Sequence, residues 1–233
     1  MPPWDIDERM FLSEPEVCRL LRQVRAAERG ASDVAQPTAA TDRMIVELLL
    51  FSGLRTSEFC RLLVADTSVV TGAAALEVRG KPGTARSVWL PAAVDRLIRA
   101  YVRQTRPAFL PTGVAAEDPG HALVFNEHRR PYERTGLYRR VVRVLAAAGL
   151  GERASVQLLR HTYGYLAYKR SGGNLLFVQR QLGHAHPMIT SIYAQFVNES
   201  YGDIADRIGN ENDTRGAALR AGRARAGSTG APR

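Results

Sequence analysis

Apolar residues recur every three or four positions along most of this chain, which is the spacing of amphipathic helices. The first such stretch opens on Ser13-Glu14-Pro15-Glu16, a capping box with proline in the first turn. A strongly apolar stretch follows and ends at Gly53, where glycine favours a helix stop. The expected helices span about 13–29, 41–52, 56–65, 92–104, 134–148, 156–170, 175–182, 187–196 and 201–208.

Two short β-prone segments interrupt the helices, at about 75–79 and 87–90. The glycine- and proline-rich segment Gly80-Lys81-Pro82-Gly83-Thr84 separates them and is typical of a hairpin turn. The apolar run Leu123-Val124-Phe125 is a candidate third strand. The predicted fold is therefore mainly α with a small antiparallel β-hairpin or sheet, an α+β class.

The length of 233 residues suits one good-sized domain. We expect an N-terminal extension over 1–10, a domain over 11–208, and a disordered tail rich in arginine, glycine and alanine over 209–233. No stretch reaches the ~18 apolar residues of a membrane span. The acidic, proline-interrupted N-terminus is unlike a secretory signal, so we expect a cytoplasmic protein without membrane contact.

The formal net charge is +9, from 32 arginines and lysines against 23 acidic residues. This balance favours a polyanionic partner, although an arginine-rich composition alone produces the same charge. Lysine occurs only as Lys81 and Lys169, which are therefore candidates for chemistry that arginine cannot perform. Cys18 and Cys60 are expected to be buried free thiols, and no histidine–cysteine–carboxylate spacing indicates a metal site.

The candidate chemistry is phosphodiester cleavage without a metal. Such cleavage needs neutralised non-bridging oxygens, a nucleophile and a proton for the leaving 5′-oxygen. Arginine binds phosphate oxygens with a planar fork, tyrosine can attack to form a covalent link, and lysine or histidine can donate the proton. The residues with this chemistry are Arg55, Lys81, Arg160, His184 and Tyr193.

The motifs around these residues resemble, in order and rough spacing, the catalytic domain of the tyrosine recombinase (phage integrase) family, from about Phe11 to Ile208. They are Gly53-Leu54-Arg55-Thr56-Ser57-Glu58, Gly80-Lys81, Leu159-Arg160-His161-Thr162, Leu182-Gly183-His184 and Ile192-Tyr193. The resemblance implies a phosphate clamp of Arg55 and Arg160, with Glu58 orienting the cations. It further implies that Lys81 protonates the leaving oxygen, that His184 is the second active-site histidine, and that Tyr193 forms a 3′-phosphotyrosyl intermediate. It implies neither a metal nor a nucleotide cofactor.

One position departs from the family pattern. The family usually has a histidine three residues before the second arginine, and this chain has Gln157. Glutamine can donate a hydrogen bond to phosphate but cannot shuttle a proton, so we expect a slower or differently tuned enzyme. His161 is not expected to substitute, because one helical step turns it about 100° from the face of Arg160.

Each assignment has a structural alternative. Arg55 could be a solvated residue after a helix stop, Lys81 a turn lysine, and His184 a polar loop residue. Tyr193 competes with other tyrosines, and its spacing from His184 decides the choice. Arg160 has apolar neighbours, and so we expect it to be paired with an anion.

A second arginine cluster surrounds the predicted helix at 134–148. We expect its members to contact DNA phosphates or guanine edges, although a solvated charged face is the alternative. The candidate DNA-binding residues are Arg129, Arg130, Arg134, Arg139, Arg140 and Arg143.

The resemblance also implies double-stranded DNA and other copies of the chain as partners. Most family members carry an N-terminal DNA-clamping domain, and here the catalytic-type segment begins near Phe11. We therefore expect a minimal form that depends on tetramer assembly on DNA, through a helix at 201–208, and possible accessory DNA-binding proteins.

The leading interpretation is a site-specific recombinase, as found in mobile elements, that cuts and rejoins DNA. The alternatives are a topoisomerase or resolvase with related chemistry and a catalytically weakened or inactive DNA-binding or regulatory relative.

Overall fold

The computed structural model describes residues 7–80, 84–184 and 193–196. The main helices are α1 (Glu14–Arg29), α2 (Gln36–Ser52), α3 (Thr56–Cys60), α4 (Ser68–Thr71), α5 (Ala92–Ala100), α6 (Arg134–Ala147), α7 (Val156–Arg170) and α8 (Leu175–Leu182). The strands are β1 (Ala75–Arg79) and β2 (Ala85–Trp89), which form a two-stranded antiparallel sheet. Short helical turns span Glu8–Met10, Val64–Asp66, Arg106–Phe109, Gly151–Arg153 and Ala194–Phe196. The predicted fold class is confirmed.

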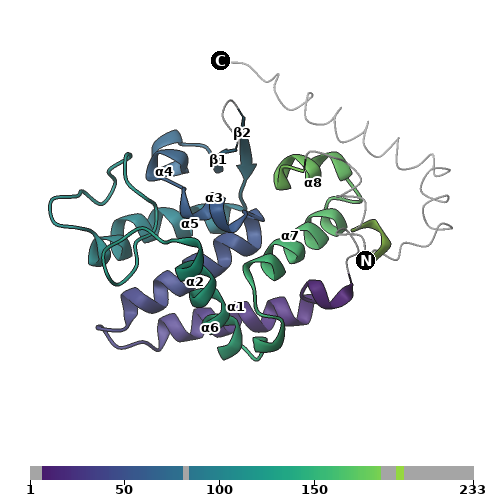
Figure 1. Ribbon diagram of the computed structural model, residues 1–233, viewed down its shortest axis with the longest axis horizontal. Coiled ribbons are helices and arrows are strands. Elements are labelled where there is room, and N and C mark those ends of the chain that lie inside the picture. Colours follow the sequence, from purple (N-terminus) through teal and green to yellow (C-terminus); the bar gives the residue numbers. More distant parts are fainter. Residues whose placement is uncertain (1–6, 81–83, 185–192, 197–233) are drawn as a thin grey trace, which may run out of the picture. The chain divides into compact units, whose positions relative to one another are not determined.

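Helix α2 lies at the centre of the core and packs against α1, α5, α6 and α7 (Figure 1). Its apolar residues cover most of its circumference, as expected for a helix surrounded by others. Leu48 and Leu50, on different faces, are both fully buried. Gly53, at the end of α2, is therefore buried in the interior of the domain. Helix α3 begins close by, at Thr56, and α7 packs against α2.

The helix boundaries follow their caps. Ser13 and Glu16 form the predicted capping box at the start of α1. Helix α2 begins at Gln36, five residues before the predicted start, because Pro37 is accommodated in its first turn. The expected helix at 92–104 is α5 followed by a π-helical turn at Tyr101–Thr105.

The hairpin pairs Val78 with Arg86 and Leu76 with Val88. Val78, Leu76 and Val88 are buried, so Arg86 lies on the inward face of the sheet. Helix α8 packs against β2 on this side of the domain. The predicted third strand at 123–125 is wrong: Leu123 donates only a single backbone bond to Leu62, and the neighbouring contacts are isolated bridges.

Several predicted features lie outside the described residues: Lys81, most of the helix at 187–196, the helix at 201–208 and the tail at 209–233. The chain divides into units 1–196 and 197–233, and the second falls wholly in this category. In the described part, no helix is both long and apolar enough to cross a membrane. Cys18 and Cys60 are free thiols, but Cys18 is exposed, contrary to the prediction, because it faces away from the buried stripe of α1.

Candidate active site

Arg55 enters the site from the junction between α2 and α3. Gly53 ends α2 in a left-handed conformation (φ 62°), and Arg55 is the extended N-cap of α3. The Arg55 backbone nitrogen donates to Glu58 Oε2 at 2.8 Å, and its Nη1 donates to Glu58 Oε1 at 2.9 Å. Its Nη2 donates to the Gly183 carbonyl at 3.0 Å. The side chain is 43% exposed and so remains accessible to a ligand.

Glu58 is a buried carboxylate shared by two arginines. Besides Arg55, it accepts hydrogen bonds from Arg86 Nη1 at 2.8 Å and Arg86 Nη2 at 3.0 Å. Burial would raise the pKa of Glu58, but the bonds from Arg86 and from the Arg55 backbone outweigh it and lower the pKa to about 2. Glu58 is therefore ionised at neutral pH and orients both guanidinium groups.

Arg160 reaches the same place from the first half of α7. Its side chain is buried, with Nη1 bound to the Gly53 carbonyl and Nη2 bound to the Leu182 carbonyl, the latter at 2.8 Å. Burial, followed by repulsion from Arg55, lowers the pKa of Arg160 to about 10. The sequence predicted an anionic partner; among the described residues its bonds go to two carbonyls at the ends of α2 and α8.

The end of α8 is the common acceptor of three arginines. Arg86 Nε donates to the Gln181 carbonyl at 3.0 Å, next to the carbonyls of Leu182 and Gly183 that receive Arg160 and Arg55. The last carbonyls of a helix lack partners within the helix and lie at the negative end of its dipole, which suits them to bind cations.

The charges of this cluster do not balance. Arg55, Arg86 and Arg160 contribute three positive charges and Glu58 one negative charge, which leaves a surplus of two. His184 adds none near neutral pH: burial, then Arg160 and Arg55, lowers its pKa to about 3. Such a surplus of preorganised guanidinium groups is suited to bind an oxyanion.

Tyr193 lies against this cluster and is 1% exposed. It packs with Phe11, Val178 and Leu182 in a small apolar cluster. Burial raises the pKa of its hydroxyl to about 12, although the charge of Arg160 acts in the opposite direction. The structure therefore brings the predicted nucleophile beside one predicted phosphate ligand, with its hydroxyl shielded from solvent.

His161 contacts Tyr193 directly, which the sequence analysis did not expect. His161 Nδ1 lies 3.1 Å from the Tyr193 hydroxyl, and His161 Nε2 lies 3.0 Å from Gln157 Nε2. Although His161 projects away from Arg160 along α7, Tyr193 packs over that side of the helix. Burial, and then Arg160, lowers the pKa of His161 to about 4, so the ring is neutral. With the amide nitrogen of Gln157 donating to Nε2, the ring proton resides on Nδ1 and faces Tyr193.

A comparison with known proteins shows the family of the chain. The sequence profile of the phage integrase family matches residues 11–199. The chain belongs to the phage integrase family.

Similar proteins include several named tyrosine recombinases. XerD of Corynebacterium glutamicum is 30% identical over 173 residues, covering 74% of this chain and 54% of XerD. XerC of Mycobacterium bovis is 34% identical over 177 residues, covering 74% of this chain and 55% of XerC. The chain thus spans about half the length of these curated relatives.

Solved structures share the fold. A XerH recombinase bound to palindromic difH substrate in a post-cleavage complex has a TM-score of 0.66 and 24% identity, covering 86% of this chain and 53% of that one. The Tn1549 transposon integrase in complex with a circular intermediate DNA has a TM-score of 0.65 and 15% identity, covering 88% and 67%. At these identities the likeness concerns the fold.

Five of the six arginines expected to bind DNA are exposed in this integrase-family domain. A tight turn precedes α6, in which the Asn126 side chain accepts bonds from the backbone nitrogens of His128 and Arg130. Arg129 adopts a left-handed conformation there (φ 58°), an unfavourable one for a residue with a side chain. The exposed members are Arg129, Arg130, Arg134, Arg139 and Arg143.

Arg140 corrects the prediction. It is buried, with Nε donating to Asp42 at 2.5 Å, Nη1 to Glu127 at 3.1 Å and Nη2 to the Thr38 carbonyl at 3.0 Å. It lies on the face of α6 that packs against α2. Its role is to tie these helices together, and it is not available to DNA in this arrangement.

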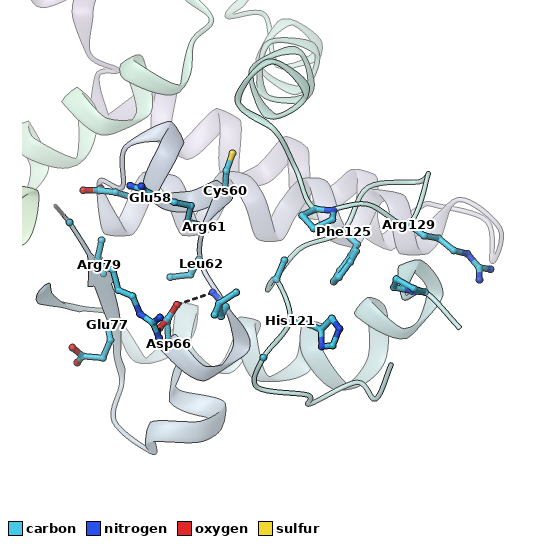
Figure 2. A pocket seen from close by; sticks show the side chains of 17 residues that line it. Glu58, Cys60, Arg61, Leu62, Asp66, Glu77, Arg79, His121, Phe125 and Arg129 are labelled. Atoms are coloured by element: carbon cyan, nitrogen blue, oxygen red, sulfur yellow. Dashed lines mark hydrogen bonds and ion pairs between the residues drawn. The ribbon is translucent and has the colours of Figure 1, made fainter. Parts of the chain in front are cut away.

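A cavity of about 680 Å³ lies beside the cluster, and Glu58 also lines it (Figure 2). Arg61, Arg79 and Arg129 are exposed residues of its lining, and Asp66 neutralises Arg79 at 3.0 Å. Among the described residues no group of three or more histidine, cysteine or acidic side chains could hold a metal ion.

Sequence reasoning missed Arg86 and the contact of His161 with Tyr193. The signal for Arg86 was available: an arginine on the inward face of a short strand, between a glycine-rich turn and Val88. A charged residue at such a position needs a buried partner.

Proposed function

We propose that this chain contains the catalytic domain of a site-specific DNA recombinase that cleaves and rejoins strands through a 3′-phosphotyrosyl intermediate. The observation that supports it best is the convergence of Arg55 and Arg160 on adjacent carbonyls at the end of α8, with Tyr193 beside Arg160. The two-charge surplus of the cluster fits a phosphodiester, whose charge grows during attack.

In the proposed reaction a scissile phosphate binds to Arg55 and Arg160. The Tyr193 oxygen forms a bond to phosphorus and gives its proton to the neutral imidazole of His184. The bond from phosphorus to the 5′-oxygen breaks, and Lys81 protonates that oxygen as it leaves. Attack by a 5′-hydroxyl on the phosphotyrosyl bond reverses these steps and restores the tyrosine. Because Tyr193 is buried, the reaction requires its hydroxyl to leave its present environment.

The partner in this proposal is double-stranded DNA. The relatives are named recombinases, and solved neighbours are described as bound to difH substrate or to circular intermediate DNA. Arg129 and Arg130 on their tight turn, and Arg134, Arg139 and Arg143 on α6, supply exposed cations for phosphates.

We further propose that copies of the chain assemble on DNA. Trp89, Leu176 and Phe177 are exposed apolar side chains at β2 and α8, next to the elements that form the site. Exposed aromatic and aliphatic residues of this kind favour a protein contact.

A second candidate function is DNA binding without cleavage. Two observations favour it: Gln157 stands where the family usually has a histidine, and the Tyr193 hydroxyl is bound to His161 and shielded from solvent. An experiment on covalent adduct formation separates the two functions.

The test uses the full chain and a pool of randomised duplexes nicked near the cleavage position. The released fragment diffuses away, so that religation cannot reverse cleavage. A recombinase should form an adduct that survives denaturation, and Tyr193→Phe should abolish it. Tyr165→Phe is a matched control, because Tyr165 stacks on Phe11 at 4.5 Å and has no part in the proposed chemistry. Retarded mobility without a covalent adduct would instead support the DNA-binding function.

A further inference from the structure

Arg86 uses every nitrogen of its guanidinium group on the candidate active site. Nη1 and Nη2 bind the two oxygens of Glu58, and Nε binds the Gln181 carbonyl. Its side chain is 17% exposed, compared with 43% for Arg55. Arg86 is therefore a poor candidate for direct contact with DNA and a good one for a contact within the protein.

One partner of Arg86, Glu58, also binds Arg55, and its other partner lies near the second group that binds Arg55. Glu58 Oε1 accepts from both Arg86 Nη1 and Arg55 Nη1, so a change in the carboxylate orientation changes the position of Arg55. The carbonyl of Gln181 is two residues from that of Gly183, which accepts Arg55 Nη2.

Gly183 brings the end of α8 close enough for these contacts. Its backbone is left-handed (φ 63°), and a Cβ at this position would lie 2.9 Å from the Arg86 guanidinium. The end of α8 is thus packed directly on Arg86, and this same segment accepts Arg160 through Leu182.

We propose that Arg86 is a positioning residue for the phosphate-binding arginines. It fixes the Glu58 carboxylate and the end of α8, and through them the guanidinium groups of Arg55 and Arg160. The inference rests on the proposed function, because a position matters here only if these two arginines bind a scissile phosphate. No other residue in the described part of the chain is bound to both Glu58 and the end of α8 except Arg55 itself.

A purely structural role is the competing explanation, and the chain contains a matched pair that tests it. Arg25 Nε and Nη2 bind the two oxygens of Glu47 at 2.8 and 3.0 Å, the same two distances as in the Arg86–Glu58 pair. Glu47 is also buried, with its side chain 2% exposed against 4% for Glu58. The Arg25–Glu47 pair joins α1 to α2 and is bonded to none of the site residues that the structure describes.

The experiment measures the rate of single-turnover adduct formation on a duplex selected from the randomised pool because it forms the adduct. The duplex carries either a normal phosphodiester or a methylphosphonate at the scissile position. The methylphosphonate lacks the charge of one non-bridging oxygen, so its cleavage depends less on well-placed guanidinium groups. Arg86→Lys keeps the positive charge, but an ammonium group cannot bind both Glu58 oxygens and the Gln181 carbonyl in the same geometry.

We expect Arg86→Lys to slow cleavage of the phosphodiester by about 10- to 100-fold, as small displacements of catalytic groups do. The methylphosphonate should lose much less, so the ratio of the two rates should shift by about tenfold. Arg25→Lys should leave this ratio at the wild-type value, even where it lowers the melting temperature. DNA affinity should be the same for both variants.

If Arg86→Lys does not fold, Arg86→Gln replaces it, because the glutamine amide can still donate to Glu58 and the bond from Arg55 keeps that buried carboxylate paired. The same shift in the ratio is expected. Equal losses on both substrates, or a ratio shift equal to that of Arg25→Lys, would overturn the role of Arg86. Failure of the wild-type chain to form any adduct would refute the proposed function itself, a result distinct from these.

Discussion

The clearest single-residue determinant is Gly164, in the middle of α7. A Cβ at this position would lie 2.6 Å from the hydroxyl oxygen of Tyr193, a distance that real Cβ atoms do not show. Glycine weakens a helix interior by about 1 kcal/mol relative to alanine. Its presence here is explained by the space that it leaves for the aromatic ring.

If this explanation holds, the change in stability caused by Gly164→Ala should have opposite signs with and without the Tyr193 ring. In the wild-type chain, Gly164→Ala should lower the free energy of unfolding, because it displaces the buried Tyr193 ring. Loss of that burial costs about 1.5–3 kcal/mol, which exceeds the gain of about 1 kcal/mol in helix propensity. In a Tyr193→Ala background the same substitution should stabilise the protein by about 1 kcal/mol. Urea denaturation of the four proteins of this cycle measures both effects. The same sign in both backgrounds would show that the ring does not occupy this position.

At the scale of elements, Arg106 organises the long connection between α5 and α6. Its fully buried guanidinium donates to the carbonyls of Ala116 at 2.6 Å and Ala122 at 2.7 Å, and it lies over the Phe125 ring at 5.3 Å. Burial lowers its pKa, and among the described residues no carboxylate binds it. Hydrogen bonds from this one side chain thus hold the connection together, in place of the third strand that the sequence suggested.

Arg106→Lys should therefore destabilise the fold more than a surface substitution. A lysine cannot reach the carbonyls on both sides, and each buried acceptor left without a donor costs about 1–3 kcal/mol. We expect a loss of at least about 2 kcal/mol in urea denaturation. Arg103→Lys is the control, because within the described part of the chain the exposed Arg103 pairs with exposed Glu117 alone and should change stability by less than about 0.5 kcal/mol. Equal effects of the two substitutions would contradict this role.

Elements with local signals were predictable, and those set by distant contacts were not. The bounds of α7, α8 and β1 match the prediction, since helical periodicity and the glycine- and proline-rich sequence of residues 80–84 mark them. That Arg55, Glu58 and Arg160 are neighbours was implied by the family resemblance and not by this local reasoning. Local reasoning missed Arg86, whose partners lie 28 and 95 residues away, and it placed Arg140 on DNA because nothing local indicates the pairing with Asp42 across 98 residues.

At the scale of the whole molecule, the arginines that contribute to the net charge of +9 are of two kinds. One kind is buried and bound to carbonyls or carboxylates, as Arg106, Arg140 and Arg160 are. The other kind is exposed, as on the outer face of α6. Composition alone cannot separate them, since both contribute equally to the formal charge.

Helix α6 provides a direct test of this division. If Arg139 contacts a DNA phosphate, Arg139→Gln should weaken binding and reduce the slope of log affinity against log salt concentration by about 0.9. Arg140→Gln should leave that slope unchanged and lower stability, because Asp42 loses its buried partner. Fluorescence anisotropy at several salt concentrations, with urea denaturation of both variants, measures these outcomes. An unchanged slope for Arg139→Gln would exclude this helix face from the interface.

The surplus of guanidinium charge around Glu58 also sets a conflict between durability and activity. In the free domain, the described residues do not fully neutralise the like charges of these guanidinium groups, and their repulsion lowers stability. The simplest substitution that removes this repulsion replaces one of the arginines. Selection for heat resistance alone would thus tend to erode the site. Variants selected in that way would be more thermostable proteins that no longer recognise their substrate.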